Sequence, residues 1–304
     1  MKDLFTFTGE NEIEFYKQFS TKANCLQYLA ERKWKDGFKC PTCGSIEEYH
    51  TPVLHHKRCK GCLNLCSPTA NTMFHKLKFG IEKAFVAIFK MSATTKSISA
   101  EQLAKTLGVN RKTALAFQHK VRLAMKSSEQ HPMKGEVEVD EAFIGGQEDS
   151  QHRGRGAESK TQVVVAVEKS GKFGVKRVYA RVIENGSTSE LMTIFDKHIS
   201  PNAKVLTDKW KSYGPISKIY NIVQEKSEPK ENFQVMHRCI QQLKSWIRGG
   251  HHHVSPEYLQ AYLNEFCYRI NRSIHKETIF DNLMNRMILA APCLHNSLKN
   301  NYWC

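Results

Sequence analysis

The sequence predicts a multidomain α+β chain, and three observations along its 304 residues support this class. Half of the ten cysteines fall between positions 40 and 66, in a loop-rich stretch. Apolar residues at helical spacing follow in 79–125, and strand-like alternation of apolar and polar residues begins at position 136. A chain of this length holds about two or three domains of roughly 100–200 residues each.

The amino-acid composition indicates what kind of molecule this protein binds. The chain has 45 Lys and Arg against 30 Asp and Glu, a net charge of +15 that indicates a polyanion-binding protein. Hydrophobic residues make up 40% and charged residues 25%, ordinary proportions that exclude wholesale disorder. No run reaches the roughly 18 uncharged apolar residues of a membrane helix, and the acidic N-terminal stretch lacks the features of a signal peptide. We therefore expect a cytoplasmic protein without a membrane partner.

Residues 1–36 are expected to form an N-terminal helical brace. Apolar side chains such as Phe15, Phe19, Leu26 and Leu29 recur there at helical spacing and predict one or two short helices. We expect this brace to support the cysteine-rich residues that follow.

Residues 37–75 contain two CxxC pairs, Cys40 with Cys43 and Cys59 with Cys62, separated by fifteen residues. This spacing is typical of zinc sites. Two such pairs complete the closed tetrahedral shell of a structural Zn²⁺, which supplies folding energy that a small loop-rich module cannot gain by burial alone. We predict a zinc ribbon.

Alternatives to the four-cysteine site stay open. The site could use Cys66, His55 or His56 as a ligand, or the thiols could have a redox role. We expect Cys66 to be a small buried hydrophobe rather than a ligand.

Residues 76–130 are predicted to be helical and to contain a helix-turn-helix. Ser99 stands three positions before Gln102, a capping-box spacing, while Gly108 lies in the turn and Asn110 can cap the second helix. A basic start to that helix suits recognition of the DNA major groove; the alternative is a plain helical hairpin with a solvated basic face. The residues expected to face water or DNA are Arg111, Lys112, Gln118, His119, Lys120 and Arg122.

From position 136 the spacing of apolar residues changes from a helical to a strand-like pattern. Alternating patterns predict strands in the stretch GEVEVDEAFIGG and at 162–169 and 175–184, followed by a helix at 188–198 and a short strand at 203–207. A polar loop occupies 147–160, and helical patterns return at 233–247 and 255–270. This order predicts an α/β domain over 134–275, with a helical C-terminal tail at 276–304.

Two aspartates end strands of this domain. Asp140 lies near the end of the first strand and Asp208 directly follows the fourth. Carboxylates suit Mg²⁺ or Mn²⁺, and a bridged metal pair can stabilise both oxygens of a phosphoryl displacement. The alternative is that each aspartate is an ordinary turn or cap residue.

A predicted helix adds two candidates. His237 and Lys244 are seven residues apart, nearly two helical turns, so both side chains lie on one face. A metal ligand and a phosphate-binding lysine can share such a face. Otherwise His237 is a partly buried polar residue and Lys244 a solvated one.

Three blocks carry a family resemblance: VEVDEAFIGG, VLTDKWKSY and HRCIQQLKSWIRGGHHHVSPEYLQAYLNEFCYRINR. In order and spacing they resemble the DDE-superfamily transposases of bacterial insertion sequences. They are most similar to the Merlin-related branch, which combines an N-terminal zinc ribbon with a ribonuclease-H-like catalytic domain. The segment KRCKGCLNLCSPTANTMFHK is also similar to that branch, so the resemblance covers about residues 15–275.

The resemblance implies a site and a chemistry. Asp140 and Asp208 correspond to the first two metal-binding aspartates, and His237 stands where the superfamily usually has a third acidic residue. Lys244 corresponds to the lysine seven positions later. With two Mg²⁺ or Mn²⁺ ions, this site would cut and join DNA strands at the terminal inverted repeats of a mobile element. Assembly as a homodimer or larger synaptic complex, in the bacterial cytoplasm at the nucleoid, follows from the family.

His237 departs from the usual acidic residue, because neutral imidazole brings no negative charge and is a softer ligand than Mg²⁺ prefers. Glu265 is the alternative third ligand. Glu141 should point to the opposite strand face from Asp140 and is not expected to be a ligand. The tract His251–His253 is expected to be an exposed or DNA-contacting loop.

The sequence thus predicts a transposase that binds double-stranded inverted-repeat and target DNA. Two other classes stay open. One is a catalytically inactive, transposase-derived DNA-binding regulator, and the other is a nuclease that cuts without joining.

Overall fold

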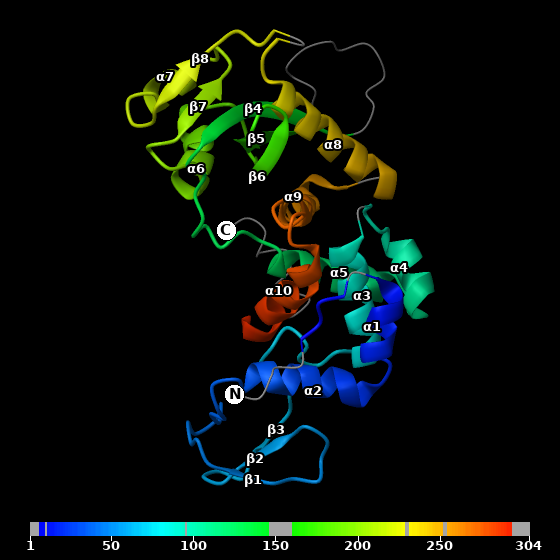
Figure 1. Cartoon of the computed structure of the whole chain (residues 1–304). Coiled ribbons are helices and arrows are strands. Elements are labelled where there is room, and N and C mark those ends of the chain that lie inside the picture. Colours follow the sequence, from blue (N-terminus) through cyan, green and yellow to red (C-terminus); the bar gives the residue numbers. More distant parts are fainter. Residues whose placement is uncertain are drawn as a thin grey trace. The chain divides into compact units, whose positions relative to one another are not determined.

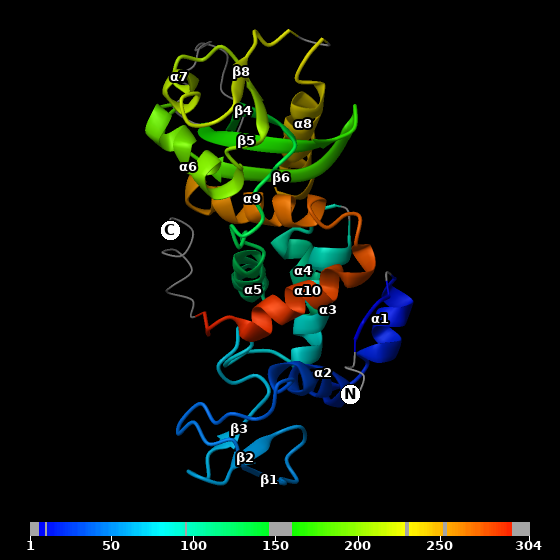
Figure 2. The same cartoon turned by 60° about the vertical axis from the view of Figure 1, so that its left-hand side comes forward.

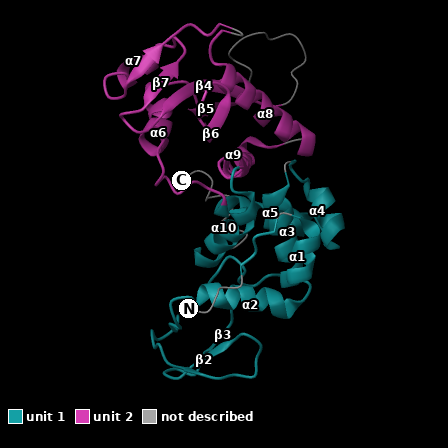
Figure 3. Ribbon diagram, viewed as in Figure 1, with its two compact units in different colours: residues 1–124, 274–298 teal, residues 125–273, 299–304 magenta. Residues whose placement is uncertain are grey.

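The computed structural model describes residues 6–9, 11–94, 96–145, 160–228, 231–251 and 254–293. The chain forms two compact units, residues 1–124 with 274–298 and residues 125–273 with 299–304 (Figure 3). No helix in the described part of the chain is both long enough and apolar enough to span a membrane. The predicted loop at 147–160 lies outside the described residues except for Lys160.

The first unit joins helices to a small antiparallel sheet (Figure 1). The sheet, in the order β1-β2-β3, is antiparallel throughout and lies among the cysteines. The elements of this unit are α1 (Glu12–Gln18), α2 (Lys22–Lys33), β1 (Glu48–Tyr49), β2 (Lys57–Cys59), β3 (Leu65–Cys66), α3 (Ile81–Ala93), α4 (Ala100–Leu107), α5 (Arg111–Ala124) and α10 (Lys276–Leu289).

An aromatic core holds the helices of this unit together. Phe15 stacks on Phe89 at 4.4 Å between ring centroids, and Phe280 of α10 makes edge contacts with both Phe7 and Phe15. Asp281 accepts hydrogen bonds from the Tyr28 hydroxyl and from Arg32. One or two short N-terminal helices were predicted, and the structure has two, α1 and α2; α10 lies in the predicted tail, whose residues 294–304 are outside the described part.

The second unit is built on a mixed five-stranded sheet in the order β6-β5-β4-β7-β8. Strands β4, β5 and β6 pair antiparallel, whereas β4-β7 and β7-β8 pair parallel. The elements are β4 (Glu136–Ile144), β5 (Thr161–Ser170), β6 (Gly174–Val182), α6 (Thr188–His198), β7 (Lys204–Thr207), α7 (Tyr213–Ile216), β8 (Ile222–Gln224), α8 (Gln234–Gly250) and α9 (Pro256–Ile270). This α/β architecture confirms the predicted fold class at that level, and its order is compatible with a ribonuclease-H-like fold.

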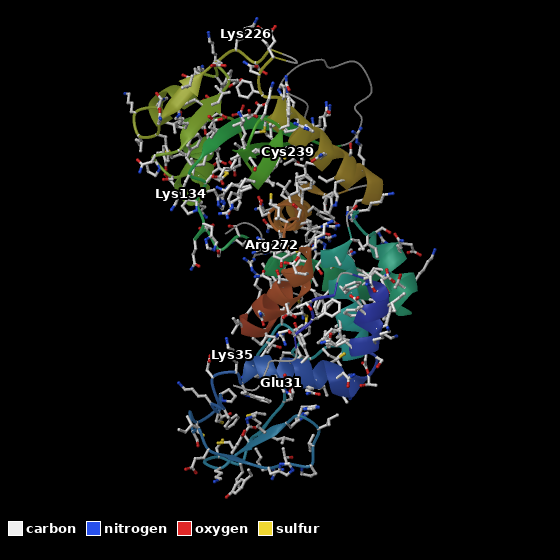
Figure 4. All side chains as sticks on the ribbon, viewed as in Figure 1. Glu31, Lys35, Lys134, Lys226, Cys239 and Arg272 are labelled. Atoms are coloured by element: carbon white, nitrogen blue, oxygen red, sulfur yellow. The ribbon has the colours of Figure 1, made fainter. Side chains whose placement is uncertain are left out.

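Both faces of the sheet are covered, as Figure 2 shows. On one face, α8 and α9 bury Val163, Val165 and Val167, and Cys239 of α8 lies in this core (Figure 4). On the other face, α6 and α7 cover Val137, Val139 and their neighbours. Because alternate residues of β4 enter opposite cores, side chains at 138 and 140 share a face, and those at 139 and 141 share the other.

Candidate active site

The four predicted zinc ligands lie together. Each of Cys40, Cys43, Cys59 and Cys62 offers a sulfur atom, and these atoms are all within 4.8 Å of one another. The Cys40–Cys62 and Cys43–Cys59 sulfurs are 3.5 and 3.4 Å apart. A tetrahedral site with Zn–S distances of about 2.3 Å has sulfurs about 3.8 Å apart, so this group fits structural Zn²⁺ closely.

Cys66 lies outside that group. It is buried, at 3% exposure, and packs with Phe38, Cys40 and Cys59 in a small cluster bordered by Trp34. Among the described residues, neither His55 nor His56 belongs to the cysteine group; the ring of His56 instead contacts the carbonyl of Leu54 at 2.8 Å. The geometry therefore favours the four-cysteine set over a site that uses Cys66, His55 or His56.

Helices α4 and α5 have the predicted caps. The Ser99 hydroxyl accepts from the Gln102 amide at 3.1 Å, Gly108 ends α4 in the left-handed conformation, and Asn110 accepts from the Lys112 amide at 2.8 Å. Glycine suits the left-handed turn because it has no Cβ to clash. The start of α5 is solvent-exposed, with Arg111 at its first position.

The expectation for the rest of α5 was wrong. Gln118 and Arg122 are fully buried and His119 is 6% exposed, so they do not face solvent, and Lys120 is half-buried. The Gln118 amide donates to the carbonyl of Ile98 at 2.9 Å, which turns it towards the protein. Only the first turn of α5 therefore offers its basic side chains fully to solvent.

The sheet brings Asp140 and Asp208 together. Strands β4 and β7 are parallel neighbours, and Val139 pairs with Thr207. Asp140 follows Val139 within β4 and Asp208 directly follows the end of β7, so the register places them side by side. The Trp210 amide donates to Asp208 Oδ1 at 3.0 Å, and the Glu141 amide donates to Asp140 Oδ1 at 2.8 Å.

Glu141 joins these two aspartates, contrary to the expectation from strand alternation. Carboxylate oxygens of Asp140, Glu141 and Asp208 all lie within 4.8 Å of one another. The predicted face of Glu141 is correct, because its carboxylate accepts a hydrogen bond at 2.6 Å from Tyr213, a buried residue of the α6-α7 core. Three hard oxygen donors at this spacing fit Mg²⁺ or Mn²⁺.

The pKa of Asp140 reflects the burial and the charges of the carboxylate group formed by Asp140, Glu141 and Asp208. Burial raises the pKa of Asp140 to about 6, with a further contribution from the charge of Asp208 and opposing contributions from the Glu141 amide and from Lys244. Lys244 is half-buried on α8 and is therefore electrostatically coupled to the carboxylate group. The predicted link between the aspartate site and this lysine has a physical basis.

The other candidates lie elsewhere. His237 is half-buried, its Nε2 is 3.3 Å from the Ser227 hydroxyl, and it is not part of the carboxylate group among the described residues. Glu265 is fully buried and pairs with Arg269 at 3.3 Å. His251 is half-buried with its ring 4.6 Å from that of Tyr262, so it is not an exposed loop residue; His252 and His253 lie outside the described part.

One structural carboxylate was missed in the sequence. Glu138 is 4% exposed and accepts a hydrogen bond at 2.9 Å from the backbone amide of Met236, at the start of α8. It therefore ties the helix of Lys244 to the strand of Asp140. Its position two residues before Asp140, on the same strand face, was the available signal.

Comparison with known proteins places the second unit in a family. Residues 132–271 match the model of the ISXO2-like transposase domain. An uncharacterized protein in transposable element ISH50 of Halobacterium salinarum is 23% identical over 213 residues, covering 66% of this chain and 71% of that protein.

Two solved assemblies show weak overall similarity, each with a TM-score of 0.28 and 11% identity. One is a simian T-cell lymphotropic virus intasome in complex with PP2A regulatory subunit B56 gamma, where the match covers 56% of this chain and 61% of that chain. The other is a pre-cleavage Mos1 transpososome, with 65% and 76% covered.

The family and relative matches agree on the class of the second unit: residues 132–271 carry an ISXO2-like transposase domain, and the relative is a protein of a transposable element. The sequence-based family prediction is confirmed.

Proposed function

We propose that this chain is an active transposase that cuts and joins DNA at the inverted repeats of an insertion sequence, acting on chromosomal DNA in the cytoplasm. The observation that carries the proposal is the parallel register of β4 and β7, which sets Asp140 beside Asp208 within the ISXO2-like domain. On this proposal, the second unit is a ribonuclease-H-like catalytic domain.

The carboxylates of Asp140 and Asp208 would hold the catalytic cations, with His237 the third ligand expected from the sequence. Mg²⁺ or Mn²⁺ bound there would supply charge that stabilises the attacking and leaving oxygens of a phosphodiester. The amides of Trp210 and Glu141 fix one oxygen of each aspartate, so both carboxylates are oriented in advance. Lys244 would contact a phosphate oxygen and offset charge that develops in the transition state.

Two displacements would share this site. In the first, water attacks the phosphorus at the element end, and the bond to the 3′ oxygen breaks to release a 3′-hydroxyl. In the second, that hydroxyl attacks a phosphorus of target DNA, and the equivalent target bond breaks. Joining at paired ends needs two active sites, so we propose a dimer or larger complex.

The first unit would hold the DNA ends. The cysteine group would bind structural Zn²⁺ in a ribbon, and the exposed basic start of α5 would contact DNA with Arg111 and Lys112. Lys120, half-buried and more than two turns further along α5, remains a weaker DNA-contact candidate. The net charge of +15 would add affinity that falls steeply with salt.

The test incubates the full chain with a labelled duplex of the element end and a target plasmid, in Mg²⁺ or Mn²⁺. The wild type is expected to nick the end and form joined products, and Asp208→Asn to form neither. Glu136→Gln, an exposed acid at the start of the same strand, is the matched control and should retain activity. Binding without cleavage under either ion would favour the regulator, and cleavage without joining would favour the nuclease.

A further inference from the structure

We propose that the second unit binds the phosphate backbone of DNA in a basic cavity on the α6 side of its sheet, apart from the catalytic carboxylates. The cavity has a volume of about 260 Å³ and lies between the segment before β4 and the strands β5 and β6. The ionisable residues that line it are His131, Lys134, Glu168, Lys176 and Arg177. The inference rests on the proposed function only for the identity of the polyanion as double-stranded DNA.

The cavity is separated from Asp140 both across the sheet and along it. Glu168 shares its face of β5 with Ala166, which lies in the α6-α7 core. Asp140 shares its face of β4 with Ala142, which lies in the core under α8 and α9. The register pairs Asp140 with Val165, three residues before Glu168, a separation of about 10 Å along the strand. A phosphate in the cavity is therefore a different one from a phosphate at the catalytic carboxylates.

The segment before β4, which forms one wall of the cavity, is fixed to its surroundings. Met133 is fully buried, and its backbone amide donates to the carbonyl of His198 at 2.7 Å. The carbonyl of His131 accepts from the Arg177 guanidinium at 2.6 Å and from the Tyr179 hydroxyl at 3.2 Å. The cavity is therefore preformed, which lowers the entropy cost of binding a ligand there.

The acidic residue of the lining, Glu168, already has its charge matched within the protein. It is 2% exposed, and its Oε1 accepts from the ammonium group of Lys176 at 3.1 Å. The same oxygen accepts from the backbone amides of Lys134 and Gly135 at 3.2 and 3.0 Å. Because these donors offset its negative charge, Glu168 leaves little repulsion for an anion that enters the cavity.

Two cations of the lining are left over. Among the described residues, neither the exposed Lys134 (Figure 4) nor the half-buried Arg177 forms an ion pair with a carboxylate. Glu129, on the same segment as Lys134, pairs with Lys197 at 3.1 Å instead. The cavity is polar and smaller than the roughly 300–1,000 Å³ of small-molecule pockets. Since lysine and arginine are the side chains that hold DNA phosphates, a backbone phosphate fits it better than an organic cofactor does.

The experiment measures the affinity of the full-length protein for a fluorescent DNA duplex of unrelated sequence, by anisotropy, at about 50–200 mM salt and without added divalent cations. Lys134→Gln and Arg177→Gln should each reduce the slope of log affinity against log salt by about one, the value for one lost phosphate contact. The loss of affinity should be largest at low salt and should fade as the salt rises, because counterion release drives the contact.

Two variants control for net charge and for structure. Lys218→Gln removes the same charge from an exposed lysine of this unit that does not line the cavity, and it should keep the wild-type slope. Arg177→Lys keeps the positive charge and should also keep the slope, whereas a purely structural role of Arg177 would make it behave like Arg177→Gln. Lys134 is exposed, so Lys134→Gln should fold normally, and thermal melting of each variant checks this.

The outcomes separate this inference from the proposed function. If Lys134→Gln and Arg177→Gln give the same slope as Lys218→Gln, the cavity has no DNA-binding role and the catalytic proposal is untouched. If calorimetry shows that the wild type binds inorganic phosphate, and Lys134→Gln loses this binding without a change in the duplex slope, the cavity takes a free anion and not DNA. Failure of the wild type to bind any duplex would remove the proposed function as well. Slopes as predicted, without strand cleavage in Mg²⁺ or Mn²⁺, would support the cavity and remove only the proposed function.

Discussion

The cysteine group and the carboxylate group are both suited to metal ions, but their surroundings differ. The cysteines lie among two- and three-residue strands with a core of only a few side chains, chiefly Phe38 and Trp34. The carboxylates lie on a five-stranded sheet with a large core on each face. On the proposed function, the first region would need a cation to fold, whereas the second is folded by burial and would need a cation only for chemistry.

The largest effect should follow loss of a ribbon cysteine. Cys59→Ser removes a buried sulfur ligand, and the apparent binding energy of a structural zinc site is about 10–16 kcal/mol. We expect the ribbon to unfold while the sheet of the second unit remains. Proteolysis mapped by mass spectrometry should then cut selectively within 37–75.

Cys66→Ala is the matched control for that variant, because Cys66 is equally buried but outside the cysteine group. It should keep its zinc and resist cleavage in the ribbon. Equal cutting of both variants would show that packing, and not the metal, holds the ribbon.

At the carboxylates we expect a loss of activity without a loss of stability. Asp208→Asn should lower strand cleavage by about 10³-fold or more, roughly 4 kcal/mol of transition-state stabilisation, because a neutral amide is a poor ligand for the catalytic cation. The melting temperature should not fall, since the aspartates repel each other in the metal-free fold. Cleavage rates and calorimetry on the same preparation provide the measurement, and a large loss of stability would contradict the contrast drawn here.

Glu138→Ala should lower the free energy of unfolding, by less than the loss of the zinc site in Cys59→Ser. The substitution leaves the amide of Met236 without its acceptor at the buried start of α8 and removes a favourable charge from a helix N-terminus, at a cost of about 2–3 kcal/mol. Urea unfolding monitored by circular dichroism measures this cost. Because the variant disturbs the helix of Lys244, cleavage should also slow, whereas Glu136→Gln should do neither.

The smallest effect concerns Glu168, on β5. Burial alone would raise its pKa, but the pKa is lowered overall because Lys176 and the amides of Lys134 and Gly135 donate to the carboxylate. A lowered pKa in the folded state stabilises the protein above the unfolded value of about 4.5, and this contribution is lost as the pH falls through the folded value. Glu168→Gln should cost about 1–2 kcal/mol at pH 7.

The pH dependence checks the origin of that cost. The difference in unfolding free energy between wild type and Glu168→Gln should shrink as the pH falls below about 4.5. A difference that stays constant from pH 7 to pH 3 would mean that shape, and not charge, is responsible.

The sequence predicted the regular parts of this fold because their signals are local. Alternation marked β4, β5 and β6, and the spacing of the cysteines marked the four-cysteine group. Helices α4 and α5 were marked by Ser99, Gly108 and Asn110. The short elements α7 and β8 escaped prediction because three or four residues carry too little periodicity.

The predictions from sequence failed where the position of a side chain depends on residues far away in the chain. The helical pattern of α5 does not reveal that Ile98 accepts from Gln118, so a buried amide was expected in solvent. Strand alternation gave the correct face for Glu141 but could not show that β7 ends before it. Asp140 and Asp208 were found because each was expected at the end of a strand. In the structure Asp208 does follow β7, but Asp140 lies in the middle of β4, and only the register shows that the two are neighbours.

The most direct test of the central claim measures both metals in the same full-length protein, zinc by mass spectrometry and Mn²⁺ by electron paramagnetic resonance, in wild type, Cys59→Ser and Asp208→Asn. The account predicts about one zinc per chain, lost in Cys59→Ser and kept in Asp208→Asn. It predicts Mn²⁺ binding that is lost in Asp208→Asn and kept in Cys59→Ser. Loss of zinc from Asp208→Asn, or Mn²⁺ binding that persists in it, would contradict the separation of a folding metal from a catalytic one.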